Sequence, residues 1–176
     1  MEPIADFFLK RIIVSPSFNS PNPVADQNLL FPGFLSLWQT CVQQYKQKHP
    51  THDLTFTETY RSNVLQGKYF NQGASKIKVN GMHHYGIAGD AIFIINGQQS
   101  YKGDINLLRD IYEENDLTIL GTWDLFHVQF ISVGKQQALR DQVTANVKAF
   151  QAANGLDDDG KVGPLTIAKA KEVFGG

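Results

Sequence analysis

The sequence places histidines and aspartates beside small residues, in patterns that suit a metal site. The stretch HHYGIAGD begins at His83 and ends at Asp90, and the glycines and alanine between them let the chain turn tightly. Further along, DLFH holds Asp124 and His127 three residues apart. Two imidazoles and a carboxylate suit Zn²⁺, and three protein ligands leave one coordination position open, as in catalytic zinc sites. The pattern therefore indicates Zn²⁺ held by His83, Asp90 and His127, with Asp124 close by.

Other polar residues give weaker signals. Arg61, predicted at the end of a strand, carries a permanent positive charge that could stabilise an oxyanion. His49 and His52, in KHPTHD, are interpreted as polar loop residues, and Cys41 as a core residue on an apolar helical stripe. Bare spacings such as His–x₆–Asp also arise by chance. From the residue types alone, ordinary loop histidines without a metal therefore remain the alternative to a metal site.

Three motifs, taken in order, resemble a known enzyme family. Residues 60–66 read YRS–x₃–Q, residues 83–90 read HxxGxAxD, and residues 124–129 read DxxHVQ, similar to the family pattern DxPHFQ. Together they resemble the zinc D-Ala-D-Ala carboxypeptidase and L-Ala-D-Glu endopeptidase family, the VanY-type peptidoglycan peptidases. The resemblance spans roughly residues 55–132.

The resemblance implies a role for each matching position. His83, Asp90 and His127 would hold Zn²⁺, Asp124 would act as general base and then as acid toward the leaving amine, and Arg61 would hold the substrate carbonyl and its developing oxyanion. Further positions are expected to bind substrate: Tyr60, Ser62, Gln66 and Trp123.

The chain also departs from the family pattern. Gly81 replaces a serine two residues before the first histidine, Phe126 replaces a proline, and Trp123 directly precedes Asp124. An aspartate rather than a glutamate at the base position favours the L-Ala-D-Glu endopeptidases over the D,D-carboxypeptidases. His84 has no family counterpart and is interpreted as lying behind the ligands or at the surface.

Periodicity predicts the elements that must position these residues. Apolar residues at helical spacing indicate helices over 5–14 and 34–48, and Ser62 and Asp104 are expected to cap two more. Alternating or continuous apolar runs predict strands over 54–62, 75–82, 90–95, 117–123 and 125–133. Because no regular βαβ cycle is present, the expected fold class is α+β, with a small, mainly antiparallel sheet flanked by helices.

The chain divides into three predicted parts. Residues 1–33 form an N-terminal helix and a Pro-rich wrap, residues 34–134 the zinc peptidase catalytic domain, and residues 135–176 a short helical module. VKAFQ, NGL and DGKVGPLT, within 147–166, resemble the second half of the small helical peptidoglycan-binding domain. The tail is thus expected to be a truncated copy of that module, with a helical hairpin packed on the catalytic domain as the alternative.

Composition limits the partners and the location. Sixteen Lys and Arg against 17 Asp and Glu give a formal net charge of −1, which argues against bulk attraction to nucleic acid or anionic membranes. The single cysteine excludes an internal disulfide, and no apolar run is long enough for membrane insertion. The acidic start MEPIAD does not resemble a secretory signal, so synthesis in the cytoplasm is expected, with action in the periplasm or cell wall after holin release, secretion or lysis.

These observations predict a zinc metallopeptidase that hydrolyses a peptide bond in the stem peptide of bacterial peptidoglycan. The L-Ala-D-Glu endopeptidase activity of an endolysin or a delivered antibacterial effector is favoured, with D-alanyl-D-alanine carboxypeptidase as the alternative. A non-catalytic wall-binding or tail-structural protein is the alternative of another class. Secretion machinery, a holin or an immunity protein are the further partners considered.

Overall fold

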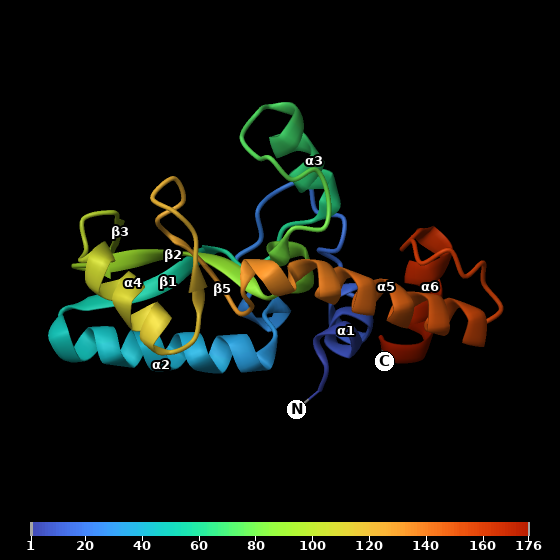
Figure 1. Ribbon diagram of the computed structural model, residues 1–176, viewed down its shortest axis with the longest axis horizontal. Coiled ribbons are helices and arrows are strands. Elements are labelled where there is room, and N and C mark those ends of the chain that lie inside the picture. The colour runs from blue at the N-terminus through green and yellow to red at the C-terminus, as the bar shows by residue number, and fades with distance from the viewer. Residues whose placement is uncertain (1, 176) are drawn as a thin grey trace.

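The computed structural model describes residues 2–175 and contains one five-stranded antiparallel sheet (Figure 1). Its main path runs β1-β2-β5-β4, and β3 pairs with β2 beside that path. The strands are β1 His52–Glu58, β2 Ala88–Ile95, β3 Gln98–Ser100, β4 Thr118–Ile119 and β5 His127–Gln129. With helices before, between and after these strands, the predicted α+β class is confirmed.

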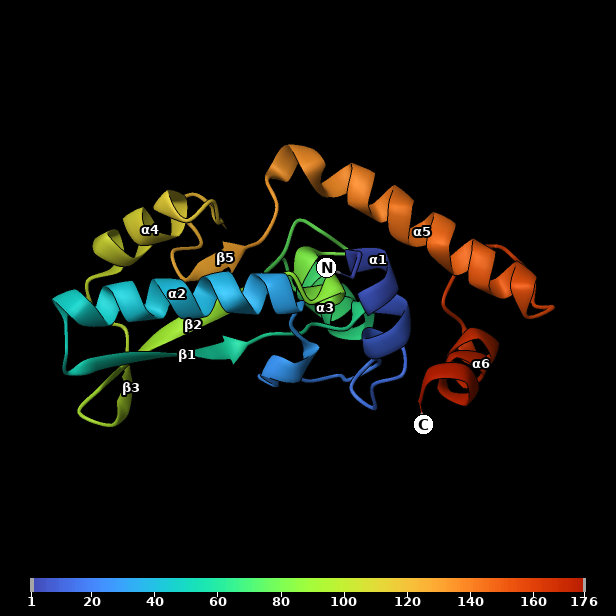
Figure 2. The ribbon, with the colours of Figure 1, turned by 90° about the horizontal axis from the view of Figure 1, so that it is seen from below.

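Two amphipathic helices pack together beside the sheet. Figure 2 shows α2 (Pro32–Lys48) running along β1 and β2, with α4 (Ile105–Glu114) at its side. The Trp38 indole N–H donates to the Tyr112 hydroxyl at 3.1 Å inside this interface. Cys41 lies in the same core, fully buried as predicted, and burial raises the pKa of its thiol to about 11. This packing fixes the half of the sheet that carries β1 and β2.

The N-terminal segment folds back on the molecule as an ordered wrap. It consists of α1 (Ile4–Phe7), the π-helical turn η1 (Phe8–Ile12) and, after an irregular stretch, the 3₁₀ turn η2 (Gln27–Leu29). Val24 forms an isolated bridge with Tyr60, and the Phe31 N–H donates to the Gly86 carbonyl at 2.7 Å. The wrap therefore contacts the backbone on both sides of the predicted metal site.

Both predicted helix caps are present. The Ser62 hydroxyl accepts a hydrogen bond from the Leu65 N–H at the start of α3 (Asn63–Asn71), and the Asp104 carboxylate accepts one from the Leu107 N–H in α4. Figure 1 shows α3 and the chain that follows it standing out from the body of the molecule. Ser62, four residues after the end of β1, thus fixes the start of α3.

Several predicted strands are shorter or missing. Residues 75–82 form no strand: the segment is irregular up to the 3₁₀ turn η3 (Met82–Tyr85), because the Gln66 side chain, rather than a neighbouring strand, binds the Ile77 carbonyl. β1 ends at Glu58 instead of continuing to Ser62, after an irregularity in its register. Only two residues of 117–123 and three of 125–133 pair, as β4 and β5.

The tail is a pair of helices, α5 (Gln136–Ala153) and α6 (Pro164–Phe174), that follows the 3₁₀ turn η4 (Val133–Lys135). Asn154 is the C-cap residue of α5, and Gly155 follows it with a φ of 69°. Figures 1 and 2 show α5 passing the N-terminal helices and α6 lying at the far end from β3. No helix within residues 2–175 has both the length and the apolar character needed to cross a bilayer.

Candidate metal centre

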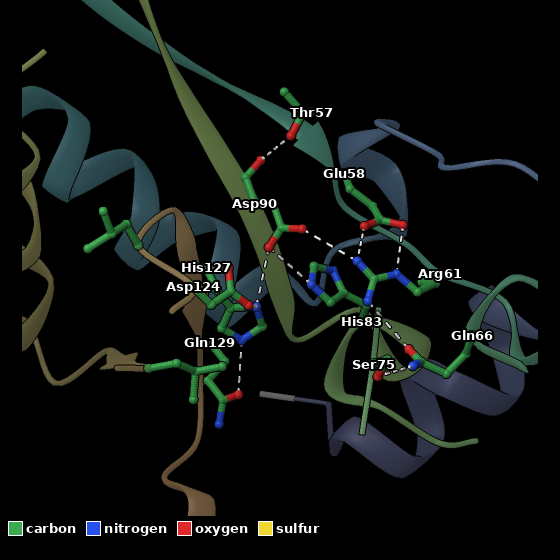
Figure 3. A network of polar contacts seen from close by, with 12 residues as sticks. Thr57, Glu58, Arg61, Gln66, Ser75, His83, Asp90, Asp124, His127 and Gln129 are labelled. Carbon is green, nitrogen blue, oxygen red and sulfur yellow. Dashed lines mark hydrogen bonds and ion pairs between the residues drawn. The ribbon is translucent and has the colours of Figure 1, made fainter. Parts of the chain in front are cut away.

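The register of the sheet places three polar side chains in one row. Glu58 of β1 is paired with Asp90 of β2, and Asp90 is paired with His127 of β5. Residues directly opposite one another in antiparallel strands project to the same face of the sheet. Figure 3 shows these side chains converging with His83, Asp124 and Arg61. Strand pairing therefore assembles a site from residues far apart in the sequence.

The small residues of HHYGIAGD are required by close approaches of the chain. Gly86 has a φ of 68°, and a Cβ at this position would overlap the Leu29 carbonyl oxygen of the N-terminal wrap. A Cβ on Gly89 would overlap the ring of Phe56 on the neighbouring strand. These two glycines let η3 turn directly into β2, which sets His83 opposite Asp90.

The three predicted ligands lie together, and the two histidines are shielded from water. The His83 Nε2 and the His127 Nδ1 each lie 3.3 Å from the Asp90 Oδ1. One donor atom from each residue lies within 4.8 Å of the others, and the two histidine side chains are only 5% and 7% exposed. A tetrahedron with zinc–ligand bonds of about 2.05 Å has edges of about 3.4 Å. Both the donor types and their separations therefore fit a zinc-sized divalent ion.

Gln129 fixes the orientation of the His127 ring. Its amide Nε2 donates to the Ile131 carbonyl at 2.6 Å, so its Oε1 is left to face the His127 Nε2 at 3.1 Å. Because an amide oxygen only accepts, the His127 Nε2 carries a proton. The Nδ1 therefore faces the Asp90 carboxylate and is the nitrogen that a metal would bind once it is deprotonated. His83 differs, since its buried Nδ1 has no hydrogen-bond partner among residues 2–175.

The surroundings of the site shift the pKa values of Asp90 and Asp124 in opposite directions. Burial disfavours a charge on Asp90, but the two imidazoles and their hydrogen bonds outweigh it, so the pKa of Asp90 lies well below its usual value. Asp124 shows the opposite balance: burial is the largest effect and raises the pKa of its carboxyl, with a further contribution from the charge of Asp90. Asp90 is thus a ready anionic donor, and Asp124 is a carboxylate with increased affinity for a proton.

Arg61 is held at the edge of the same row. Its Nε donates to the Glu58 Oε1 at 2.9 Å, and its Nη2 forms a close ion pair with the other carboxylate oxygen. The same Nη2 lies 3.5 Å from the Asp90 Oδ2, and the guanidinium carbon lies 5.0 Å from the centre of the Tyr69 ring. A bidentate carboxylate and an aromatic face leave the guanidinium little freedom, so its charge is directed at the metal ligands.

Gln66 connects Arg61 to the loop after α3. Its Oε1 lies 3.4 Å from the Arg61 Nη1, and its Nε2 donates to the Ser75 hydroxyl at 2.8 Å and to the Ile77 carbonyl at 2.6 Å. The side chain is buried, so its contacts in this structure are with the protein.

Tyr60 and Ser62, on either side of Arg61, are fully buried. The Tyr60 hydroxyl donates to the Phe18 carbonyl at 2.8 Å, and the Ser62 hydroxyl donates to the Ser20 carbonyl. Both side chains therefore contact the N-terminal wrap and hold the backbone from which Arg61 projects.

Asp124 and Trp123 form the open rim of the centre. The Asp124 Oδ2 lies 4.0 Å from the His127 Nδ1, and the side chain is partly exposed. Trp123 is 78% exposed, with its indole over Gly121. Asp124 thus lies between the ligands and solvent, and Trp123 presents a free aromatic surface beside it.

The remaining histidines lie away from the ligand set. His84 is buried rather than at the surface: its ring packs against Phe8 and Phe18, and burial lowers the pKa of the imidazole to about 4. His49 stacks on His52 with ring centroids 5.0 Å apart. His52 is the first residue of β1 and not part of a loop, which corrects that prediction.

Glu58 and Gln129 contact Arg61 and His127, and the sequence predicts a role for neither of them. Glu58 lies three residues before Arg61, and Gln129 lies two residues after His127, on the same face of β5. The two-residue period of a strand was therefore a usable signal for Gln129. Nothing local marks Glu58, because its role depends on the register between β1 and β2.

Comparisons with known proteins add two findings. Residues 124–169 match the family described as "Putative peptidoglycan binding domain", which confirms the predicted likeness of the tail. The match begins at Asp124, so it includes β5 of the sheet as well as α5. No curated protein matches the chain.

Among solved structures, the chain is similar to the crystal structure of the Serratia marcescens L-Ala D-Glu endopeptidase ChiX. The identity is 15%, the TM-score is 0.49, and the alignment covers 70% of this chain and 96% of that one.

Proposed function

We propose that the protein is a zinc-dependent peptidase that hydrolyses the stem peptide of bacterial peptidoglycan. The observation that carries this proposal is the convergence of His83, Asp90 and His127 beside a restrained arginine and a proton-accepting carboxylate. The match of the tail to a peptidoglycan-binding family supports the same polymer as substrate.

The chain's own residues account for the polar steps of peptide hydrolysis. Zinc bound by the three ligands would polarise the scissile carbonyl and acidify water. Asp124, with its raised pKa and its position between ligands and solvent, accepts a proton from the attacking water and returns it to the leaving amine. Arg61 presents its charge to the carbonyl oxygen, on which negative charge develops as water adds.

Shielding strengthens these interactions. The two histidines are nearly buried, Asp90 is mostly buried, and Arg61 is paired with a buried glutamate, so the charges act in surroundings of lower dielectric than water. Trp123 offers the exposed surface on which a substrate could rest next to Asp124. Gln66 contacts the Arg61 guanidinium, and the hydrogen bonds of Tyr60 and Ser62 to the N-terminal wrap fix the backbone on either side of Arg61.

For the bond cut, we favour the L-Ala–D-Glu linkage, because the base position holds an aspartate. Removal of the terminal D-Ala is the second candidate. We place the activity at the cell wall, in agreement with the peptidoglycan-binding match of the tail.

The test is digestion of purified peptidoglycan by the zinc-loaded protein, followed by mass spectrometry of the products. Cleavage between L-Ala and D-Glu releases a peptide that begins with D-Glu and leaves L-Ala on the glycan. Loss of one terminal D-Ala would instead identify a carboxypeptidase. Undigested wall would overturn the peptidase and favour a wall-binding or structural protein.

A matched pair of variants ties the reaction to the site. Asp124→Asn removes the proton acceptor and should lower the rate by at least roughly 100-fold. Asp110→Asn makes the same chemical change on an exposed position of α4 and should leave the rate unchanged. Equal rates for the two variants would exclude Asp124 as the base.

A further inference from the structure

A cavity of about 470 Å³ lies where the N-terminal segment, the region around η3 and the tail meet. This volume is within the range of small-molecule binding sites. His84 lines the cavity together with Phe8 and Phe18, whereas the preceding His83 faces Asp90 in the metal centre. The cavity is therefore separate from the ligand set, and the proposed peptidase reaction does not use it.

Hydrogen bonds hold two walls of the cavity. The buried Tyr60 hydroxyl binds the Phe18 carbonyl and fixes the N-terminal wall. The Asn63 amide donates to the Asn80 side-chain oxygen at 2.8 Å and accepts from the Asn80 N–H at 2.7 Å, which fixes the wall next to η3. Arg140 of α5 donates to the Asn80 carbonyl at 3.0 Å, so the tail is bound to this wall.

The third wall belongs to the tail and is equally restrained. The buried Gln151 accepts from the Gly160 N–H and donates to the Lys161 carbonyl, both at 2.9 Å. Gly160 has a φ of 76°, and a Cβ there would lie 2.9 Å from the Thr144 methyl group. The loop between α5 and α6 therefore lies directly on α5, and the cavity is a built feature of the tail's contact with the body.

The lining offers uncharged hydrogen-bonding groups on an apolar surface. Tyr85 is only 3% exposed, and its hydroxyl makes no hydrogen bond with any residue in 2–175, so it is left to the open side of the cavity. The Asn19 amide and the Thr144 hydroxyl are likewise unpaired within that range. Phenylalanine and valine side chains cover much of the rest, no carboxylate lines the cavity, and Lys161 is its one lysine or arginine.

This chemistry matches an N-acetylated sugar. A pyranose ring has apolar C–H faces that pack on aromatic and aliphatic side chains, while its hydroxyl and acetamido groups donate and accept hydrogen bonds without charge. A stem peptide carries free carboxylates, which a single lysine at this cavity would leave poorly balanced. The lining therefore favours the glycan over the peptide.

We propose that this cavity binds N-acetylated amino sugars of the peptidoglycan glycan strand, as a site separate from the metal centre. The inference rests on the proposed function in one respect, namely that peptidoglycan is the polymer bound. Tail, N-terminal wrap and body would then hold the glycan jointly, while the metal centre acts on a stem peptide.

The test is a titration of the full-length ¹⁵N-labelled protein with the tetramer of N-acetylglucosamine, followed by NMR. We expect chemical-shift changes at the Asn19 side chain, along 143–147 of α5 and at Gly160. The glucose tetramer, which lacks acetamido groups, should bind at least roughly tenfold more weakly. Equal binding of the two sugars, shift changes confined to other surfaces, or no binding would overturn the proposal.

Two variants locate the binding. Tyr85→Phe keeps the packed ring and removes the free hydroxyl, and Asn19→Ala removes an exposed amide, so each should weaken binding roughly 3- to 10-fold. Asn106→Ala, on an exposed position of α4, serves as the matched control and should bind as the wild type does. Unchanged affinity in both cavity variants would contradict the assignment.

Because this sugar contains no peptide bond, its binding is independent of catalysis. Sugar binding without wall digestion would overturn the peptidase and leave the glycan site intact. Wall digestion without sugar binding would overturn the glycan site and leave the peptidase intact. Binding of a free stem peptide in this cavity would show that the lining recognises peptide rather than glycan.

Discussion

Substitution of Glu58 by glutamine tests how the arginine of the centre is held. The wild-type carboxylate accepts from both the Nε and the Nη2 of Arg61, and both side chains are largely buried. Glutamine retains one acceptor oxygen but presents an NH₂ group to the second guanidinium nitrogen, so one charge-assisted hydrogen bond is lost. Such a bond contributes about 1.5–3 kcal/mol, and we expect the free energy of unfolding to fall by about 2 kcal/mol.

The loss stays below the roughly 3–5 kcal/mol of an unpaired buried charge, because Asp90 remains 3.5 Å from the Arg61 Nη2. Without Glu58, however, the guanidinium is free to turn toward Asp90 and away from the carbonyl it would bind. A displaced oxyanion partner should lower kcat by roughly 10- to 100-fold, with a smaller change in KM.

The assays are urea denaturation and hydrolysis of a purified muropeptide under conditions where the variant is folded. Glu114→Gln, at an exposed position of α4, is the matched control and should behave as the wild type in both. A Glu58→Gln enzyme with unchanged stability and kcat would refute the positioning role. Reduced stability with unchanged kcat would show that Glu58 serves the fold alone.

Three further predictions follow from buried groups. Gln129→Leu removes the acceptor that fixes the His127 tautomer, so zinc affinity should fall roughly 10- to 100-fold. Competition with a chromogenic chelator measures this affinity, and the control Gln99→Leu, on the exposed β3, should not change it. Cys41, whose pKa is raised to about 11 by burial, should not react with a disulfide reagent at pH 8 until the protein is denatured; reaction at the rate of a free thiol would contradict its place in the core. Burial lowers the pKa of His84 to about 4 from the ordinary value of 6.5, so the unfolded chain binds this proton more readily, and the free energy of unfolding should decrease as pH falls from 6.5 toward 4. Replacing His84 with Gln should flatten that decrease, and an identical pH dependence in the variant would show that other groups cause it.

Local signals predicted the elements that depend on short-range chemistry. Ser62 and Asp104 cap their helices through side-chain oxygens, as their positions before apolar periodic stretches indicated. The apolar run at 90–95 lies within β2, where Ala91, Ile92 and Phe93 are buried although neighbouring side chains point to opposite faces of the sheet. These features follow from a few neighbouring residues and could be found without knowing the rest of the fold.

Features that depend on distant partners could not be predicted in the same way. The alternation at 75–82 resembles a strand, but the segment is bound by the side chains of Gln66 and Asn63 instead of another strand. The place of Glu58 in the site is set by its pairing with Asp90, which is a property of the β1–β2 register. The resemblance of the motifs to a family identified the three predicted ligands, whereas Glu58, which holds Arg61, could be found only from the structure.

The proposed function requires that His83, Asp90 and His127 hold one divalent ion. Anomalous diffraction at the zinc absorption edge, from crystals of the full-length protein grown with zinc, locates that ion. We predict one strong peak between the His83 Nε2, the Asp90 carboxylate and the His127 Nδ1, and its loss in crystals of a His127→Ala variant. A zinc-soaked wild-type crystal without a peak at this place, or with zinc held only by other residues, would show that these three residues do not form the metal site.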